Sequence, residues 1–423
     1  MVLTRKAVVY LAAAYVFIGL ALMSKEPSLT VFVMPLALAF FYSSFLIRSQ
    51  RLNLKIERTL NPPRSFGGES INVTVEVRNE SSSQIDELLL EDQIPDSLEL
   101  ESGSSSLILS LRPGENVQHS YMISAPKRGR YLLGPMKASS MDILGFRQYS
   151  EEIPAMAQVM ILPKVEEVGT VELRARKVGP WPGTVPSKFV GAGTEFFELR
   201  TYLPGDELRR VNWKASAKQG RLVTNEYEAE RVTDVLVVLD CSEGVLSRLF
   251  DFDAQEFEVD LAASLCSQLI FQGNRVGVMV YGAERTWVAP AFGKRQLLRI
   301  LNGLAIVRAG RAVVPIAYVV ETIVSAVLPA RSVIVFVSPL MSDEIIEVVW
   351  DVAAAGYSLI CFTPIANSSL TNDSESELLA RRIIVMERRI NMSRIASVSR
   401  LYEVGPRTSI RLLLRRKMPW KMA

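Results

Sequence analysis

Cysteine and histidine are scarce in this chain of 423 residues. The three cysteines, Cys241, Cys266 and Cys361, are too far apart for a zinc knuckle, and in a reducing compartment we expect them to be buried thiols. The single histidine, His119, lies in a polar stretch that is typical of a strand surface. With one histidine in the chain, a Ser-His-Asp triad and a histidine-based metal site are not expected.

A strong excess of charge of either sign is also missing. The chain has 48 Lys and Arg residues against 45 Asp and Glu residues, which leaves a net charge of +3. Proteins that bind nucleic acid neutralise several phosphates with a basic surface, so nucleic acid is not expected as a partner. The sequence also lacks a P-loop and an obvious pair of catalytic carboxylates, which favours a protein that is not an enzyme.

Two long apolar runs near the N-terminus carry no charge, residues 7–24 (AVVYLAAAYVFIGLALMS) and 27–47 (PSLTVFVMPLALAFFYSSFLI). Each approaches the length that a helix needs to cross a hydrocarbon core, and only Lys25 and Glu26 separate them. We therefore predict a transmembrane hairpin of two helices over residues 1–50, with Pro35 kinking the second helix. A cleaved signal peptide is the alternative for the first run, but no small-residue cleavage site follows it.

Basic residues flank both outer ends of this hairpin. Arg5 and Lys6 precede the first run, and Arg48, Arg51 and Lys55 follow the second. Because cytoplasmic flanks are rich in Lys and Arg, we expect a multi-pass protein of the cell membrane. Both termini and all soluble domains would then be cytoplasmic.

Residues 51–165 show the two-residue period of half-buried strands. The runs LNLKIE (52–57) and INVTVEVRN (71–79) alternate apolar and polar side chains, and turn-forming stretches such as NPPRSFGGES (61–70) separate them. Several short strands at this spacing predict an antiparallel β-sandwich domain.

Residues 231–423 change to apolar strands that alternate with helices. The strands are expected at 234–240, 275–282, 332–339 and 357–364, which predicts an α/β domain with a doubly wound parallel sheet followed by basic C-terminal helices. Ligands of such sheets bind at the carboxyl ends of the strands, where this chain places Asp240, Ser338 and Thr363.

Asp240 and Ser242 end the first of these strands, and a carboxylate and a hydroxyl at this spacing can face one hard cation. With the α/β pattern around it, the segment resembles a von Willebrand factor type A domain. That resemblance implies magnesium or manganese at Asp240 and Ser242. The match is degenerate, because Gly244 replaces a second serine and residues 308–315 contain no hydroxyl for the expected threonine. The alternative is that Asp240 and Ser242 bond the loop backbone.

A second pattern occupies residues 166–230. It consists of GTEF (193–196), Arg and Tyr at 200 and 202, Gly-Asp at 205–206, and RRVNWKA (209–215). This signature resembles the domain-of-unknown-function-58 family of bacteria and archaea. KRGRYLLGP (127–135) and MDILGF (141–146) resemble the β-domain of the same family, so the resemblance covers nearly the whole chain.

Charges of opposite sign alternate within the signature, which favours ion pairs that fix an irregular segment. Binding of a partner is the other interpretation. The residues concerned are Glu195, Arg200, Tyr202, Asp206, Arg209 and Trp213.

The resemblance to the domain-of-unknown-function-58 family implies a binding role. Genes of this family commonly neighbour MoxR-type AAA+ ATPases, which implies a membrane-anchored adaptor or scaffold working with a cytoplasmic ATPase and client proteins. The alternative is an enzyme or an anion-binding or nucleic-acid-binding module that uses the charged cluster from Glu195 to Lys218.

Overall fold

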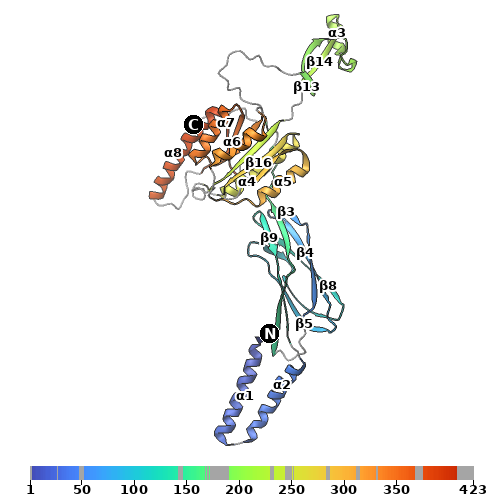
Figure 1. The fold of residues 1–423 in the computed structure, drawn as a ribbon, viewed down its shortest axis with the longest axis vertical. Helices are drawn as coiled ribbons and strands as arrows, with labels where there is room; N and C mark the ends of the chain where they lie inside the picture. Colours follow the sequence, from blue (N-terminus) through green and yellow to red (C-terminus); the bar gives the residue numbers. More distant parts are fainter. Residues whose placement is uncertain are drawn as a thin grey trace. The chain divides into compact units, whose positions relative to one another are not determined.

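The computed structural model describes residues 2–25, 27–46, 52–141, 146–166, 168, 171, 190–228, 233–242, 250, 252–282, 286–310, 315–329, 332–366 and 375–406. The chain divides into two compact units, residues 1–164 with 304–306, and residues 165–303 with 307–423. The protein is multidomain, with β-sheet in both units and an apolar helix near its N-terminus (Figure 1).

The first apolar run forms helix α1 (Arg5–Ser24). Thr4 caps its N-terminus by accepting a hydrogen bond from the Ala7 amide, and Lys25 ends it in the left-handed conformation. Within the described residues, α1 is the one helix that is long and apolar enough to cross a membrane by length and composition.

The second apolar run differs from the single helix that the sequence predicts. It forms a 3₁₀ helix, η1 (Pro27–Phe32), and then helix α2 (Val33–Leu46). Pro35 lies in the first turn of α2, where an absent N–H is tolerated. The Phe17 ring of α1 stacks on the Phe32 ring of η1 with centroids 5.6 Å apart.

The rest of the first unit is built from short strands. A five-stranded sheet has the order β1-β11-β10-β5-β7, a four-stranded sheet has the order β2-β4-β8-β6, and a three-stranded sheet has the order β3-β12-β9. The strands are β1 (Val2–Leu3), β2 (Leu54–Asn61), β3 (Arg64–Phe66), β4 (Ser70–Asn79), β5 (Ile85–Asp92), β6 (Glu99–Ser102), β7 (Ser106–Leu111), β8 (Asn116–Ser124), β9 (Gly129–Leu133), β10 (Met136–Met141), β11 (Arg147–Ile153) and β12 (Ala157–Leu162).

One core joins these sheets, as a β-sandwich requires. Ile71, Val73, Val75 and Val77 are buried at alternate positions of β4, and they share a core cluster with Leu88 of β5. The strand pairs are antiparallel except β3 with β12, which is parallel and departs from the predicted all-antiparallel pattern.

The signature segment, predicted to lack regular structure, contains an antiparallel pair. Strands β13 (Val190–Thr201) and β14 (Val223–Glu228) flank η2 (Leu208–Arg210) and the short helix α3 (Trp213–Gln219). We call residues 190–228 the signature hairpin.

The second unit also contains a six-stranded sheet of order β17-β16-β15-β18-β19-β20. All neighbouring strands are parallel except β17, an antiparallel edge strand that the sequence pattern did not reveal. Its elements are β15 (Asp234–Cys241), α4 (Ala254–Phe271), β16 (Arg275–Gly282), β17 (Thr286–Ala291), α5 (Gly293–Ala305), α6 (Ile316–Val327), β18 (Val333–Val337), α7 (Asp343–Ala354), β19 (Ser358–Pro364), α8 (Glu375–Val398) and β20 (Arg400–Val404).

Both faces of this sheet are buried. Leu236 and Val238 of β15 share one core cluster with α6, α7 and α8, whereas Val235 and Val237 point to the opposite face and are also buried. Burial on both faces explains why the central strands read as continuous apolar runs. The carboxyl ends of β15, β18 and β19 meet at one edge, which positions the first candidate site.

Candidate functional site

Asp240 lies buried at the carboxyl edge of the sheet. Its Oδ1 accepts hydrogen bonds from the Ser242 amide at 3.0 Å and the Ser242 hydroxyl at 2.6 Å. Its Oδ2 accepts a hydrogen bond from the Ser338 hydroxyl at 2.8 Å. Burial raises the pKa of Asp240, and the bonds from Ser242 and Ser338 oppose that rise by stabilising the carboxylate. The sheet thus brings together two of the three residues that the sequence placed at this edge.

Glu258 projects from α4 and is completely buried. Neither of its carboxylate oxygens has a hydrogen-bond partner among the described residues. Burial raises the pKa of Glu258 well above its usual value, the charge of Asp240 raises it further, and Arg388 opposes the rise. A buried carboxyl without a partner is costly when ionised, so Glu258 favours its protonated form.

Arg388 reaches this edge from α8, and its side chain is 4% exposed. Its Nε donates to the Pro339 carbonyl at 2.9 Å, and its Nη2 donates to the Thr363 hydroxyl at 2.8 Å and to the Pro364 carbonyl. The guanidinium therefore ties the loop after β18 to the end of β19. Thr363, the third expected residue of this edge, serves as its acceptor.

Arg388 also has an acidic and an aromatic neighbour at this edge. Arg388 Nη1 lies 4.0 Å from Glu403 Oε1, and its guanidinium lies 5.8 Å from the Phe250 ring centroid. Burial lowers the pKa of Arg388, whereas Glu403 and Glu258 raise it. We call Asp240, Glu258 and Arg388 the edge cluster, in which the Glu258 carboxyl interacts electrostatically with both the Asp240 carboxyl and the Arg388 guanidinium.

A magnesium or manganese ion at Asp240 and Ser242 is implied by the resemblance to von Willebrand factor A domains. Magnesium takes octahedral oxygen coordination, yet in the described ranges no group of three or more His, Cys, Asp or Glu side chains could hold a metal. Both nearby hydroxyls donate to Asp240, and Arg388 supplies positive charge within the same cluster. These residues do not fit the ion. Gly244 and residues 311–314, also considered for the site, lie outside the described residues.

The signature hairpin contains the second candidate group. Arg200 Nη2 donates to Asp206 Oδ1 at 3.0 Å, and Arg200 Nε donates to Glu226. Asp206 also accepts the Leu203 amide at 2.9 Å, and these bonds lower the pKa of Asp206. Gly205 turns the chain here with a φ of 108°, a conformation that other residues adopt at a cost. Arg200, Asp206 and Glu226 form what we call the arginine clasp.

The remaining signature residues lie outside the arginine clasp. Arg209 is 80% exposed and pairs with Glu207 at 2.7 Å, and Trp213 at the start of α3 is 65% exposed. The backbone amide of Tyr202 donates a hydrogen bond to the Leu222 carbonyl at 2.9 Å, and the residue is half-buried. Glu195 lies in β13, and its side chain is outside the described part of the chain. Trp213 is therefore outward-facing.

Sequence reasoning missed Glu258 and Arg388, although a signal for each was present. Glu258 shares a stripe of α4 with Ala254, Leu261 and Leu265 at helical spacing, so a charge occupies a core position. The basic C-terminal helices were expected from their arginines alone, but Arg381 and Arg388 are buried with Met392 and Ile395 on the same stripe of α8. The helical spacing of these two arginines with apolar residues was the signal that their stripe faces the protein.

Residues 198–363 match the family described as "Protein of unknown function DUF58". The chain carries a DUF58 family domain. The match begins within β13 and ends within β19, so it includes the arginine clasp and most of the parallel sheet. It covers less than half of the chain.

Curated relatives are distant. The chain is 20% identical to "Uncharacterized protein YeaD" of Bacillus subtilis (strain 168) over 63% of this chain and 65% of that protein. It is 28% identical to "Uncharacterized protein Rv1480" of Mycobacterium tuberculosis over 27% of this chain and 37% of that protein. The chain thus spans only part of the length of these relatives.

Among solved structures, one similar chain is "conserved hypothetical protein BatB from Bacteroides thetaiotaomicron". It is 12% identical, has a TM-score of 0.29, and the match covers 43% of this chain and 96% of that one. A second is native alpha-2-macroglobulin from Escherichia coli, 18% identical with a TM-score of 0.23, covering 27% of this chain and 18% of that one.

Proposed function

We propose that this protein is a membrane-anchored, non-catalytic adaptor that presents a von Willebrand factor A-like domain to cytoplasmic partners. The observation that carries the proposal is that Asp240 and Arg200 are engaged within the protein, while Glu258, which has no hydrogen-bond partner among the described residues, is completely buried. Asp240 accepts bonds from two serines, and Arg200 bridges two carboxylates. A catalytic base or nucleophile needs a free lone pair at an accessible site, which these groups do not offer.

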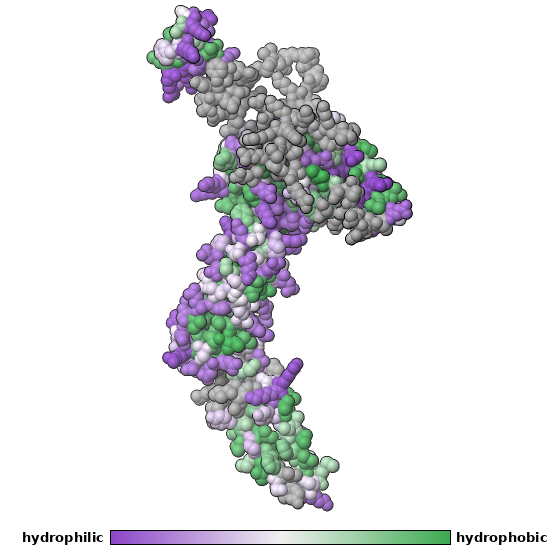
Figure 2. Space-filling model, turned by 180° about the vertical axis from the view of Figure 1, so that it is seen from behind, coloured by the Kyte–Doolittle hydropathy of each residue, from purple (hydrophilic) through white to green (hydrophobic). Residues whose placement is uncertain are grey.

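Two membrane spans are part of the proposal. The 20 residues of α1 rise about 30 Å, which is the thickness of a hydrocarbon core. The 14 residues of α2 alone rise about 21 Å, and η1 adds about 12 Å, so η1 and α2 together reach the same length. Figure 2 shows hydrophobic residues on the visible face of this part of the protein, and Val9, Tyr15 and Leu22 are among the exposed ones.

A cytoplasmic location follows from the basic flanks of the two apolar runs. The described cysteines are buried, so a cysteine introduced at the exposed residue Glu151 would report on accessibility. In intact cells, Glu151→Cys should resist a membrane-impermeant maleimide and react only after lysis. Labelling in intact cells would place this domain outside and exclude the proposed orientation.

The domain itself supports a binding role by its architecture. A mainly parallel sheet with helices on both faces gathers its loops at one carboxyl edge, as a von Willebrand factor A domain does. By resemblance, the partner is a MoxR-type AAA+ ATPase together with client proteins. The alternative, an enzyme or anion-binding module around Glu195 to Lys218, loses support because Arg200 is already paired with carboxylates.

The test is recovery of the partner from membranes. The tagged full chain, solubilised in detergent, should retain an AAA+ ATPase with and without magnesium, as identified by mass spectrometry. Trp213→Ala should lower the recovery if the signature hairpin takes part, and Phe271→Ala, which also removes an exposed aromatic ring, is the matched control. Recovery of no ATPase under either condition would reject the adaptor proposal.

A further inference from the structure

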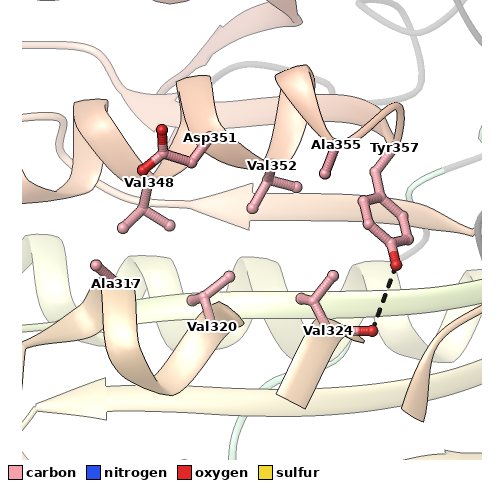
Figure 3. Close-up of a pocket in the computed structure, with 8 residues that line it drawn as sticks. All are labelled: Ala317, Val320, Val324, Val348, Asp351, Val352, Ala355 and Tyr357. Atoms are coloured by element: carbon pink, nitrogen blue, oxygen red, sulfur yellow. Dashed lines mark hydrogen bonds between the residues drawn. The ribbon is translucent and has the colours of Figure 1, made fainter. Parts of the chain in front are cut away.

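Helices α6 and α7 lie side by side on one face of the parallel sheet and leave a groove between them (Figure 3). The groove has a volume of about 310 Å³ and is lined by residues of both helices and by Tyr357. Ala317 of α6 and Ala355, which follows the last residue of α7, are small, which explains why the helices do not fill the space.

The floor of this groove is apolar. Val320 and Val324 of α6 face Val348 and Val352 of α7, and all four are buried against the sheet. The Tyr357 hydroxyl at one end donates to the Val324 carbonyl at 3.4 Å, so its hydrogen atom is already used within the protein. The groove therefore suits aliphatic groups and offers little to a polar small molecule.

The rim of the groove is acidic. Helices α6 and α7 contain five carboxylates and no Lys or Arg, in a chain whose net charge is +3. Glu347 and Asp351 of α7 are exposed, and Asp351 lines the groove toward the end opposite Tyr357 (Figure 3). Tyr318 and Trp350 are exposed on the same two helices, and aromatic residues of this kind are enriched at protein interfaces.

We propose that the groove between α6 and α7 is the docking site for a basic amphipathic helix of a partner protein. Leucine-like side chains of the partner would occupy the valine-lined floor, and a Lys or Arg one turn away would meet Asp351 and Glu347. A membrane surface is disfavoured as the occupant because anionic headgroups repel an acidic rim. This inference rests on the proposed adaptor function and adds the chemistry of the partner segment.

The test measures binding of a fluorescent 15-residue peptide of Leu and Lys at helical spacing. The full chain is held in nanodiscs of zwitterionic lipid, and anisotropy is corrected with empty nanodiscs. Charge reversal by Glu347→Lys with Asp351→Lys should weaken binding by about tenfold, because opposite charges across an interface become like charges. Ala355→Leu, which fills the groove from an exposed position, should weaken it similarly.

Glu387→Lys on the exposed surface of α8 is the matched control, and it should change the affinity by less than about twofold. A peptide in which Glu replaces Lys should not bind. Equal affinity of the wild type, the charge-reversed chain and the filled chain would overturn the proposal. A concentration-dependent dimer that Ala355→Leu abolishes would also overturn it, because the occupant would be a second copy of this chain.

Failure of this inference is separable from failure of the adaptor function. If the ATPase is recovered equally with the wild-type and the charge-reversed chains, the adaptor stands and the groove is not its docking site. If the peptide binds as expected but no ATPase is recovered, the groove is retained and the partner class is wrong.

Discussion

The edge cluster and the arginine clasp each set one arginine among carboxyl groups, but the two arginines are used differently. Arg200 is 34% exposed and bonds directly to Asp206 and Glu226. Arg388 is 4% exposed and gives its hydrogen bonds to two carbonyls and a hydroxyl, while Glu258 accepts none among the described residues. The carboxylates of the clasp are therefore paired with their arginine near water, whereas the Glu258 carboxyl of the edge cluster lies in the core without a hydrogen-bond donor among the described residues.

This difference shows that the density of charge along a sequence is a poor guide to its energetic importance. The signature has many charges within a short segment, yet ion pairs near solvent contribute little to stability. The edge cluster assembles three ionisable groups from distant elements, and each costs free energy to bury in its charged form. Substitutions should therefore have large effects at the edge cluster and small effects at the clasp.

The largest effect is expected from Arg388→Met. The substitution keeps an apolar side chain of similar length but leaves the Pro339 carbonyl and the Thr363 hydroxyl without their donor. Breaking a buried charged network should lower the free energy of unfolding by about 3–5 kcal/mol. Chemical denaturation of the solubilised full chain measures this loss, and Arg389→Met, at the next and exposed position of α8, is the control. Equal losses for both variants would contradict a special role for Arg388.

A stabilising effect that depends on pH is expected from Glu258→Gln. The pKa of Glu258 is raised in the folded state. The contribution of Glu258 to the free energy of unfolding is therefore fully present below about pH 4.3, the usual pKa of a Glu side chain, and is lost as the pH rises through its pKa in the folded state. Glutamine cannot ionise, so the variant should have the higher melting temperature at pH 8 and lose that advantage near pH 4. A gain of about 3 °C would correspond to about 1 kcal/mol. An advantage that is constant with pH would show that packing, and not ionisation, is responsible.

A smaller and local effect is expected from Arg200→Ala. Removing the guanidinium leaves Asp206 and Glu226 facing each other without a cation, which should loosen the pairing of β13 with β14. Hydrogen exchange of the amides in both strands should accelerate, with little change in global unfolding. Arg209→Ala, which removes an exposed pair with Glu207, should leave this exchange unchanged. If Arg200→Ala lowered the free energy of unfolding as much as Arg388→Met, the expected difference between the arginine clasp and the edge cluster would be wrong.

The smallest effect is expected from divalent ions. Because the described residues at Asp240 do not fit a hard cation, millimolar magnesium, manganese or EDTA should shift the melting temperature by less than about 1 °C. A saturable increase with magnesium that Ser242→Ala removes would show that ligands outside the described residues complete a site there.

Much of the fold could be predicted because its signals are local. The period of two in β4 and the continuous apolar run of β15 arise from which faces are buried, and each predicts a strand without knowledge of its neighbours. Strand β17 was missed because TWVAPA is short and contains proline, which is tolerated at a sheet edge but weakens the strand pattern.

Part of the candidate site could be predicted because three of its residues have a local signal in the sequence. Asp240, Ser338 and Thr363 follow apolar strands, so their common edge could be inferred from the parallel topology. Glu258 and Arg388 come from helices, and their meeting with Asp240 depends on how α4 and α8 pack against the sheet. Single-sequence patterns contain no information on that packing.

The short strand β1 has a mechanical consequence for the first unit. Val2 and Leu3 pair with Gln148 and Arg147 of β11, and the Thr4 amide donates to the Phe146 carbonyl at 3.0 Å. Helix α1 therefore continues directly from a strand at the edge of the five-stranded sheet. The start of α1 is thus held to the sheet by backbone hydrogen bonds, and α1 cannot rotate about its first residue without breaking them.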